Sequence, residues 1–202
     1  VRVNNSPVVC WADWAPPPPP AQSAMPTQVS LDTCSANLLV NPSFESFSSS
    51  TMAPTGWSGG AKTAGKSANM IVPAGLRYGY NHKSYAEPLY QDVAVTPGLS
   101  YNVSFYSSSH IPGAQKVKFF YIDSAGNLVG SEQVHTVTKD VDTDGKFGGP
   151  YTLTLGAAPN NAAKVRLSVS ANGTDWAKID ATCMQASGTP LPTPTNTPVV
   201  LP

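Results

Sequence analysis

The fold of this chain is decided by two short stretches, Asn37-Leu38-Leu39-Val40-Asn41-Pro42-Ser43-Phe44-Glu45 and Trp176-Ala177-Lys178-Ile179-Asp180-Ala181-Thr182-Cys183. Each is interpreted as a short strand with one inward-facing carboxylate, Glu45 in the first and Asp180 in the second. The chain between them alternates apolar and polar residues and has the right length for one two-sheet sandwich. We therefore expect one β domain whose first and last strands are neighbours.

The composition changes sharply outside these two stretches. Residues 1–33 hold seven prolines, five of them consecutive at positions 16–20, and residues 187–202 hold five more. Such segments favour extended polyproline conformations rather than a packed core. The sequence therefore predicts a proline-rich N-terminal arm at 1–33, a β domain at 34–186 and a Thr/Pro-rich C-terminal arm at 187–202.

The charge content excludes several classes of partner. Of the 202 residues 12% are charged, against about 25% in ordinary soluble domains, and the formal net charge is zero. Nucleic-acid binding needs clustered Lys and Arg, whereas here the cations are scattered. No apolar run approaches the ~20 residues that span a bilayer, so we expect no membrane insertion. The N-terminal residue Val1 favours a mature secreted polypeptide.

The central region is predicted to be all-β. Apolar residues alternate with polar ones at 101–105, 117–121, 151–155 and 165–169, and turn-forming residues separate these runs, as at 123–127. No window has the spacing of an amphipathic helix. Eight or more short strands with regular turns are typical of a sandwich, so the expected architecture is a jelly-roll β-sandwich of two antiparallel sheets with extended arms.

The three cysteines suggest an oxidising compartment. Cys34 precedes the first quoted stretch and Cys183 ends the second, so in a sandwich with neighbouring terminal strands they can approach the ~5.5 Å Cα separation of a disulfide. The alternative is two buried free thiols. A bridge would indicate an extracellular or cell-surface protein. Cys10 is then left over, which suggests a free thiol or an intermolecular bond.

Several motifs together resemble a known family. They are the opening Asn-Leu-Leu-Val-Asn-Pro-Ser-Phe-Glu, Gly56-Trp57, the stretch 89–93 followed by Pro97-Gly98-x-x-Tyr101, and the closing Lys178-Ile179-Asp180. They look like the galactose-binding-like jelly rolls of secreted carbohydrate-binding modules, over roughly residues 35–186. The C-terminal tail is similar to the Thr-Pro linkers of bacterial surface proteins. The resemblance is specific for the fold and less so for the ligand, because this fold has many functions.

The resemblance implies a structural calcium ion held by Glu45 and Asp180. Calcium prefers several oxygen ligands, which two carboxylates and backbone carbonyls can supply. The family often has a second acid directly after the last one, where this chain has Ala181. The alternative is a pair of carboxylates hydrogen-bonded to strand ends without a metal. A further acidic run at 140–145 matches half of a calcium loop, but Tyr151 stands where a glutamate is needed, which favours a solvated turn.

Sugar recognition would use aromatic rings with polar partners. The segment 77–85 is the densest such stretch and is expected to be a loop, either a binding surface or an intersubunit contact. Trp57 and Trp176 are favoured as core residues. The candidate glycan-binding residues are Trp57, Arg77, Tyr78, Tyr80, His82, Tyr85 and Gln91. The three histidines lie in separate segments and no Gly-x-Ser-x-Gly motif occurs, so we expect no enzyme.

The arms lead to the functional hypothesis. An apolar, aromatic segment precedes the polyproline run and would be costly to expose, so docking on another copy of the chain explains it. Its candidate intersubunit residues are Val8, Val9, Cys10, Trp11 and Trp14. The sequence thus favours a secreted, non-enzymatic cell-surface subunit that self-assembles, as in a filament. The alternative is a carbohydrate-binding module or adhesin. Threonines that alternate with prolines are expected to be glycosylated, namely Thr189, Thr193, Thr195 and Thr197.

Overall fold

The structure is a computed structural model and describes residues 34, 36–67, 70–172 and 175–188. This part of the chain contains ten strands and no helix, hence no helix that could cross a membrane. The strands are β1 (Ser58–Gly59), β2 (Lys62–Gly65), β3 (Arg77–His82), β4 (Leu89–Ala94), β5 (Ser100–Ser108), β6 (Lys116–Ile122), β7 (Leu128–Thr136), β8 (Gly148–Leu155), β9 (Lys164–Ser170) and β10 (Trp176–Ser187).

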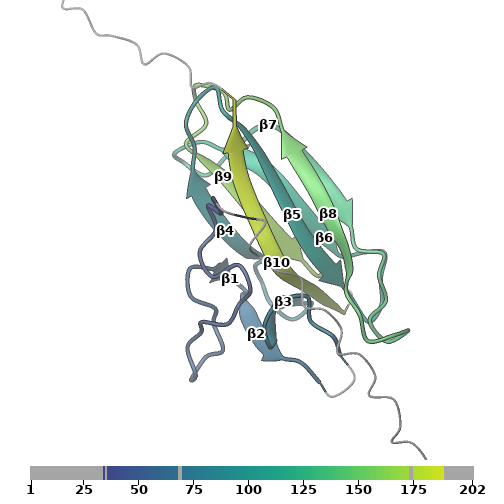
Figure 1. Ribbon diagram of the computed structural model, residues 1–202. Helices are drawn as coiled ribbons and strands as arrows, with labels where there is room; N and C mark the ends of the chain where they lie inside the picture. The colour runs from purple at the N-terminus through teal and green to yellow at the C-terminus, as the bar shows by residue number, and fades with distance from the viewer. Residues whose placement is uncertain (1–33, 35, 68–69, 173–174, 189–202) are drawn as a thin grey trace, which may run out of the picture.

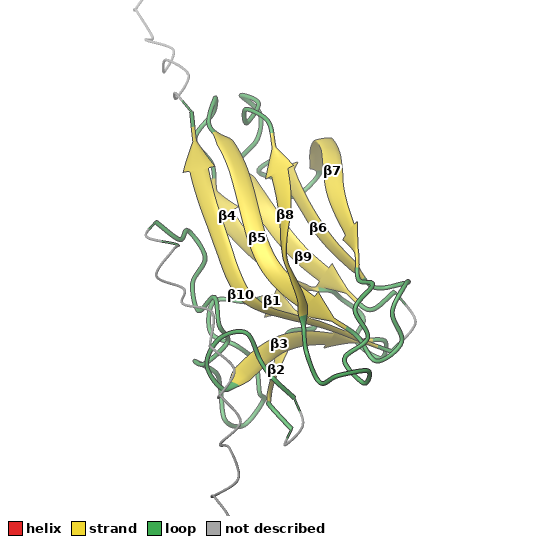
Figure 2. Cartoon of the chain, turned by 45° about the vertical axis from the view of Figure 1, so that its right-hand side comes forward, coloured by secondary structure: helices red, strands yellow, loops and turns green. Residues whose placement is uncertain are grey.

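The strands form two five-stranded sheets that pack face to face (Figure 1). The first sheet has the order β1-β4-β9-β6-β7 and the second has the order β2-β3-β10-β5-β8. Every pairing between these strands is antiparallel. The prediction of an all-β jelly-roll sandwich is confirmed. In Figure 2 the short strands β2 and β3 lie across one end of the long strands.

The main core fills the space between the sheets and follows the alternation in the sequence. On β5, Tyr101, Val103 and Phe105 are buried, and on β9 Val165 and Leu167 are buried. Successive side chains of a strand point to opposite faces, so each strand contributes every second residue to this core. The alternating apolar pattern therefore directly determines which face of each sheet is turned inward.

The β6–β7 hairpin also matches its sequence signal. The Asp123 side chain accepts hydrogen bonds from the backbone N–H groups of Ala125 and Asn127, at 2.9 and 2.8 Å. Gly126 has a φ of 88°, which favours glycine because it lacks a Cβ. This arrangement explains why the chain reverses at 123–127.

The first of the two stretches that suggested the fold is not a strand, which corrects the expectation. Asn41 and Phe44 have φ values of 51° and 60°, so the backbone turns there instead of extending. Side chains supply the hydrogen bonds that a neighbouring strand would otherwise make with this stretch. Gln91 accepts a hydrogen bond from the Val40 N–H and donates one to the Val40 carbonyl. Asn37 likewise bonds to the backbone of β10.

The second stretch lies in β10, as expected, and β10 occupies the centre of the second sheet between β3 and β5. Cys183 of this strand forms a disulfide with Cys34, with the two Cα atoms 5.9 Å apart. The predicted bridge is therefore confirmed, and the alternative of two free thiols is wrong. The bond ties the beginning of the described chain to its last strand.

A second, smaller core covers part of the outer face of the second sheet. Tyr78 of β3 packs with Val72 and Phe147, and Tyr106 of β5 lies against them. Val72 and Phe147 come from the segments 70–76 and 137–147, which cross this face. This second core buries outward-facing residues of β3 and β5 that would face solvent in a bare sandwich.

The predicted intersubunit residues Val8, Val9, Cys10, Trp11 and Trp14 lie outside the described residues. The same holds for the predicted glycosylation sites Thr189, Thr193, Thr195 and Thr197.

Candidate functional site

The dense aromatic stretch 77–85 is not a loop, which corrects the expectation, because most of it forms β3. Alternate residues of this strand face opposite sides of the sheet. Gly79 and Asn81 are turned toward the first sheet, where Phe44 packs on Gly79 and Ala171 bonds to Asn81. Tyr78, Tyr80 and His82 therefore point to the outer face of the second sheet. Strand geometry thus brings these three side chains onto one face.

Four rings meet at one end of this face and are called the aromatic cluster: Tyr80, His82, Tyr85 and Trp176. The indole of Trp176, on β10, lies 4.7 Å from the ring of Tyr80 and 4.4 Å from that of His82, measured between centroids. Tyr85 lies 6.3 Å from Tyr80, with the two ring planes inclined by 28°. All four rings are only partly buried, so the cluster offers apolar ring surface to solvent.

A cavity of about 210 Å³ opens beside the aromatic cluster and is called the end cavity. His82 and Tyr85 line it together with polar side chains, among them Lys83, Glu87 and Asn172. The Nδ1 nitrogen of His82 lies 2.7 Å from the Ser84 hydroxyl, and this hydrogen bond fixes the orientation of the imidazole. Ring surface next to hydrogen-bonding groups is the combination that binds a sugar ring, through its C–H face and its hydroxyls.

The other predicted glycan-binding residues lie elsewhere. Trp57 is 6% exposed and packs against Phe44 in the main core, so its ring does not reach the surface. Tyr78 is 8% exposed within the second core. Gln91 is buried and occupied by its bonds to Val40. The guanidinium of Arg77 lies 3.7 Å above the ring of Phe47. Trp176, favoured as core on sequence, joins the cluster instead.

Two ionisable residues of this face, Lys178 on β10 and Tyr80 on β3, have pKa values shifted by burial. Lys178 is 1% exposed, and its ammonium has no hydrogen-bond partner in the described part of the chain. Burial lowers the pKa of Lys178 to about 8, with the carboxylates of Asp175, Asp142 and Asp140 acting in the opposite direction. Burial also raises the pKa of Tyr80, and its hydrogen bond with Tyr85 adds to that effect.

The predicted metal ligands Glu45 and Asp180 both bond to the backbone of the segment 74–77. Glu45 accepts hydrogen bonds from the backbone N–H groups of Leu76 and Arg77, both at 2.8 Å. Asp180 is fully buried, and its Oδ2 accepts a bond from Ala74 at 2.9 Å. Its Oδ1 has no partner among the described residues. Burial raises the pKa of Asp180 well above its usual value, and the nearby carboxylate of Glu45 adds to this.

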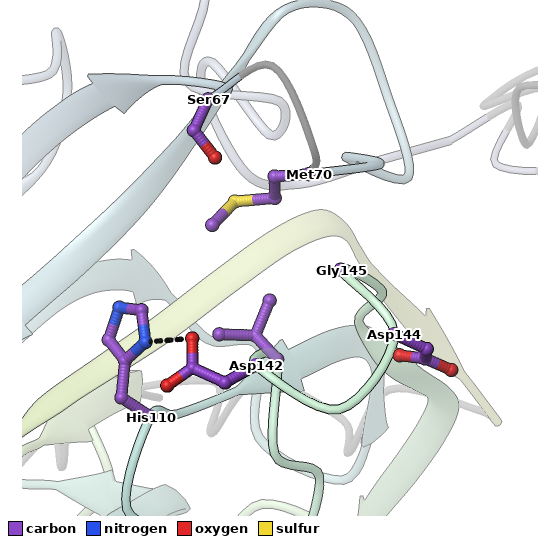
Figure 3. A pocket seen from close by; sticks show the side chains of 7 residues that line it. Ser67, Met70, His110, Asp142, Asp144 and Gly145 are labelled. Carbon is purple, nitrogen blue, oxygen red and sulfur yellow. Dashed lines mark hydrogen bonds and ion pairs between the residues drawn. The ribbon is translucent and has the colours of Figure 1, made fainter.

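A second cavity, of about 430 Å³, lies between Ser67 and Met70 on one side and the segment 141–145 on the other, and is called the groove (Figure 3). His110, Asp142 and Asp144 line it, facing Ser67 and Met70. Sequence reasoning did not identify this site. Its residues come from three separate segments, and the acidic run at 140–145 has the ordinary signature of a turn.

No protein-family model and no curated protein sequence matches this chain. Solved structures match its fold. A family 16 carbohydrate-binding module is 15% identical, with a TM-score of 0.53 over 74% of this chain and 99% of that one. The enzymatically active domain of bacteriophage CBA120 tailspike protein 4 is 15% identical, with a TM-score of 0.50 over 75% of this chain. A cyclase from Fischerella sp. TAU is 13% identical, with a TM-score of 0.50 over 77% of this chain and 98% of that one.

This chain spans about a fifth of the tailspike chain, or 21%. The expectation of a self-assembling filament subunit is wrong: a carbohydrate-binding module shares the fold over nearly its whole length, and this supports the alternative reading of a glycan-binding module. The fold and the disulfide are consistent with an extracellular protein. The chain thus has the jelly-roll fold of galactose-binding-like carbohydrate-binding modules.

Proposed function

We propose that this protein is a non-catalytic, extracellular carbohydrate-binding module that holds a sugar residue at the aromatic cluster and the end cavity. The observation that carries the proposal is the convergence of four partly exposed rings beside a cavity lined by polar side chains. Tyr85 contributes to both features, because it stacks near Tyr80 and lines the cavity. The fold shared with a family 16 carbohydrate-binding module supports it.

The size of the end cavity indicates how much of a glycan it holds. At about 210 Å³ it is smaller than the ~300–1,000 Å³ pockets that enclose drug-sized ligands. The ring planes in the cluster are inclined to one another by 28° to 68°, so they do not form one flat platform. Both features favour a single sugar residue of a soluble glycan over a flat crystalline surface.

The test is calorimetric titration of neutral oligosaccharides selected on a glycan array, using the wild type and two tyrosine variants. Tyr85→Ala removes the ring that lines the cavity, and we expect affinity to fall at least about tenfold, which corresponds to ~1.4 kcal/mol. Tyr90→Ala is the matched control, because Tyr90 is also partly buried but lies on the first sheet beneath Arg166. Loss of binding in Tyr90→Ala with retention in Tyr85→Ala would place the site on the other sheet.

We also propose that Glu45 and Asp180 hold a structural calcium ion. The unpartnered, buried Oδ1 of Asp180 supports this, because a cation would neutralise a carboxylate whose pKa is otherwise raised by burial. The described residues contain no group of three or more acidic, His or Cys side chains that could hold a metal ion, so the other ligands would be backbone carbonyls and water. The ion would brace the segment 74–77 against β10 and would take no part in catalysis.

Thermal melting with calcium or with a chelator tests this site. We expect calcium to raise the melting temperature, because a ligand at one hundred times its Kd stabilises the folded state by about 2.7 kcal/mol. Asp180→Asn should abolish the response, whereas Asp142→Asn, which changes a carboxylate in the groove, should retain it. An equal response in wild type and Asp180→Asn would contradict the assignment.

A further inference from the structure

The groove lies next to the aromatic cluster on the same face of the second sheet. His82 of β3 pairs with Trp176 of β10. On the other side of β10, Lys178 pairs with Ser108 and Ile179 with Ser107. Lys178 lies two residues from Trp176 on the same face of β10, and the carboxylates of Asp140 and Asp142 act on its ammonium. Met70, which lines the groove, and Tyr80 of the aromatic cluster pack against the same second core. The groove and the aromatic cluster therefore adjoin.

The groove presents hydrogen-bond acceptors. The Nδ1 of His110 lies 2.6 Å from Oδ1 of Asp142. Because this carboxylate accepts the Nδ1 hydrogen, the neutral ring has its lone pair on Nε2. Figure 3 shows that second nitrogen turned away from the carboxylate, on the side of Ser67 and Met70. Neither Nε2 of His110 nor Oδ2 of Asp142 has a hydrogen-bond partner among the described residues. Both atoms are free to accept a hydrogen bond from a ligand.

The charges around the groove select a neutral ligand. Asp142 and Asp144 line it, and Asp144 is ion-paired with Lys139 at 2.9 Å, so Asp142 is the carboxylate that opposes an anionic sugar. The buried ammonium of Lys178 acts on Asp140 and Asp142 from below and offsets part of their charge. The groove therefore does not require a positively charged ligand either. Hydroxyl groups, which donate hydrogen bonds without a net charge, match these acceptors.

From this arrangement we infer that the groove is a second subsite of the same glycan site, so that the ligand is a neutral oligosaccharide that extends past Trp176 from the end cavity. The inference rests on the proposed glycan binding and adds the length and the charge of the ligand. The groove has a volume of about 430 Å³, against about 210 Å³ for the end cavity, and therefore leaves room for more than one further sugar residue. His110 and Asp142 would accept hydrogen bonds from its hydroxyls.

Chain-length dependence tests the inference. The probes are β-1,4-linked ladders of glucose, xylose, mannose and galactose, from the monosaccharide to the hexasaccharide, titrated against the full chain. For a ladder that binds, we expect affinity to rise at least about tenfold between the monosaccharide and the tetrasaccharide. His110→Ala and Asp142→Ala should remove this gain while affinity for the monosaccharide is unchanged. Oligogalacturonate should show no gain with length.

The matched control is Glu132→Ala. Glu132 pairs with Lys118 on the first sheet, and its side chain is 34% exposed, as is that of His110. It should keep the full gain with chain length. Binding of the monosaccharide without a gain for longer chains, or an undiminished gain in His110→Ala and Asp142→Ala, would overturn the second subsite and leave the proposed function intact. Failure of every ladder and of every neutral glycan on the array to bind would overturn both.

Discussion

Gly79 on β3 is the residue whose size most directly limits packing. A Cβ placed there would lie 2.3 to 2.6 Å from carbons of the Phe44 ring, closer than atoms can approach. Phe44 is fully buried and cannot move into solvent. We expect Gly79→Ala to destabilise the fold by about 1–3 kcal/mol through overpacking, measured as a lower midpoint in chemical denaturation.

Gly65, at the end of β2, is the control for this change. A Cβ there has no heavy atom within 4 Å. Gly65→Ala should change stability by no more than about 0.5 kcal/mol, as surface substitutions usually do. Similar losses in both variants would mean that the contact between Phe44 and β3 does not limit the packing.

At the scale of elements, β7 and β8 form a seam where the outermost strands of the two sheets meet. His135 of β7 lies 4.0 Å from the ring of Tyr151 on β8 and 5.5 Å from that of Phe105, between centroids. Its Nε2 is buried without a partner among the described residues. Burial lowers the pKa of His135, and the positive charge of Lys116 lowers it further.

The contacts of His135 in the seam should therefore stabilise the fold less in mild acid. The unfolded chain takes up a proton near pH 6.5, whereas folded His135 does so only at a lower pH, so stability falls as the pH drops from 6.5 toward the folded pKa. The slope is at most ~1.4 kcal/mol per pH unit for one proton. His135→Gln should remove this slope in denaturation midpoints between pH 7 and 5. An unchanged slope would assign the acid sensitivity to other groups.

Elements with a local signal were predictable from the sequence. The inward residues of β5, β6 and β9 follow from strict alternation, and the 123–127 turn from its Asp and Gly, because these patterns depend only on neighbours in the chain. For the stretch 37–45 the sequence pattern predicts a strand, and this prediction is wrong. Its backbone groups bond to side chains such as Gln91, and such long-range bonds leave no mark in the local pattern.

The candidate site shows the same division. Tyr80, His82 and Tyr85 lie within six residues, so their clustering was visible in the sequence. Trp176 comes to this face only through the register of β10 with β3, and His110 only through the contact of the chain after β5 with the segment 139–142. A single sequence does not specify which strands pair, because strands distant in the chain have the same alternation. The extent of the site was therefore not predictable.

At the scale of the whole molecule, the disulfide closes a sequence separation of 149 residues. Loop entropy predicts that it stabilises the folded state by about 5 kcal/mol, because the unfolded chain loses freedom. We expect the double variant Cys34→Ser, Cys183→Ser to melt at a clearly lower temperature than wild type. Cys10→Ser, which leaves the pair intact, is the control. Equal melting of the double variant and wild type would contradict this role.

The same bond has a mechanical consequence. When tension is applied to the chain on either side of Cys34 and Cys183, the covalent link carries the load, and the 149 residues of separation between them remain unstretched. Extended at ~3.3–3.6 Å per residue, that segment would release about 500 Å of length once the bond is reduced. While oxidised, the domain behaves as a nearly inextensible connector, so the proposed site on the second sheet would keep its shape on a chain under tension.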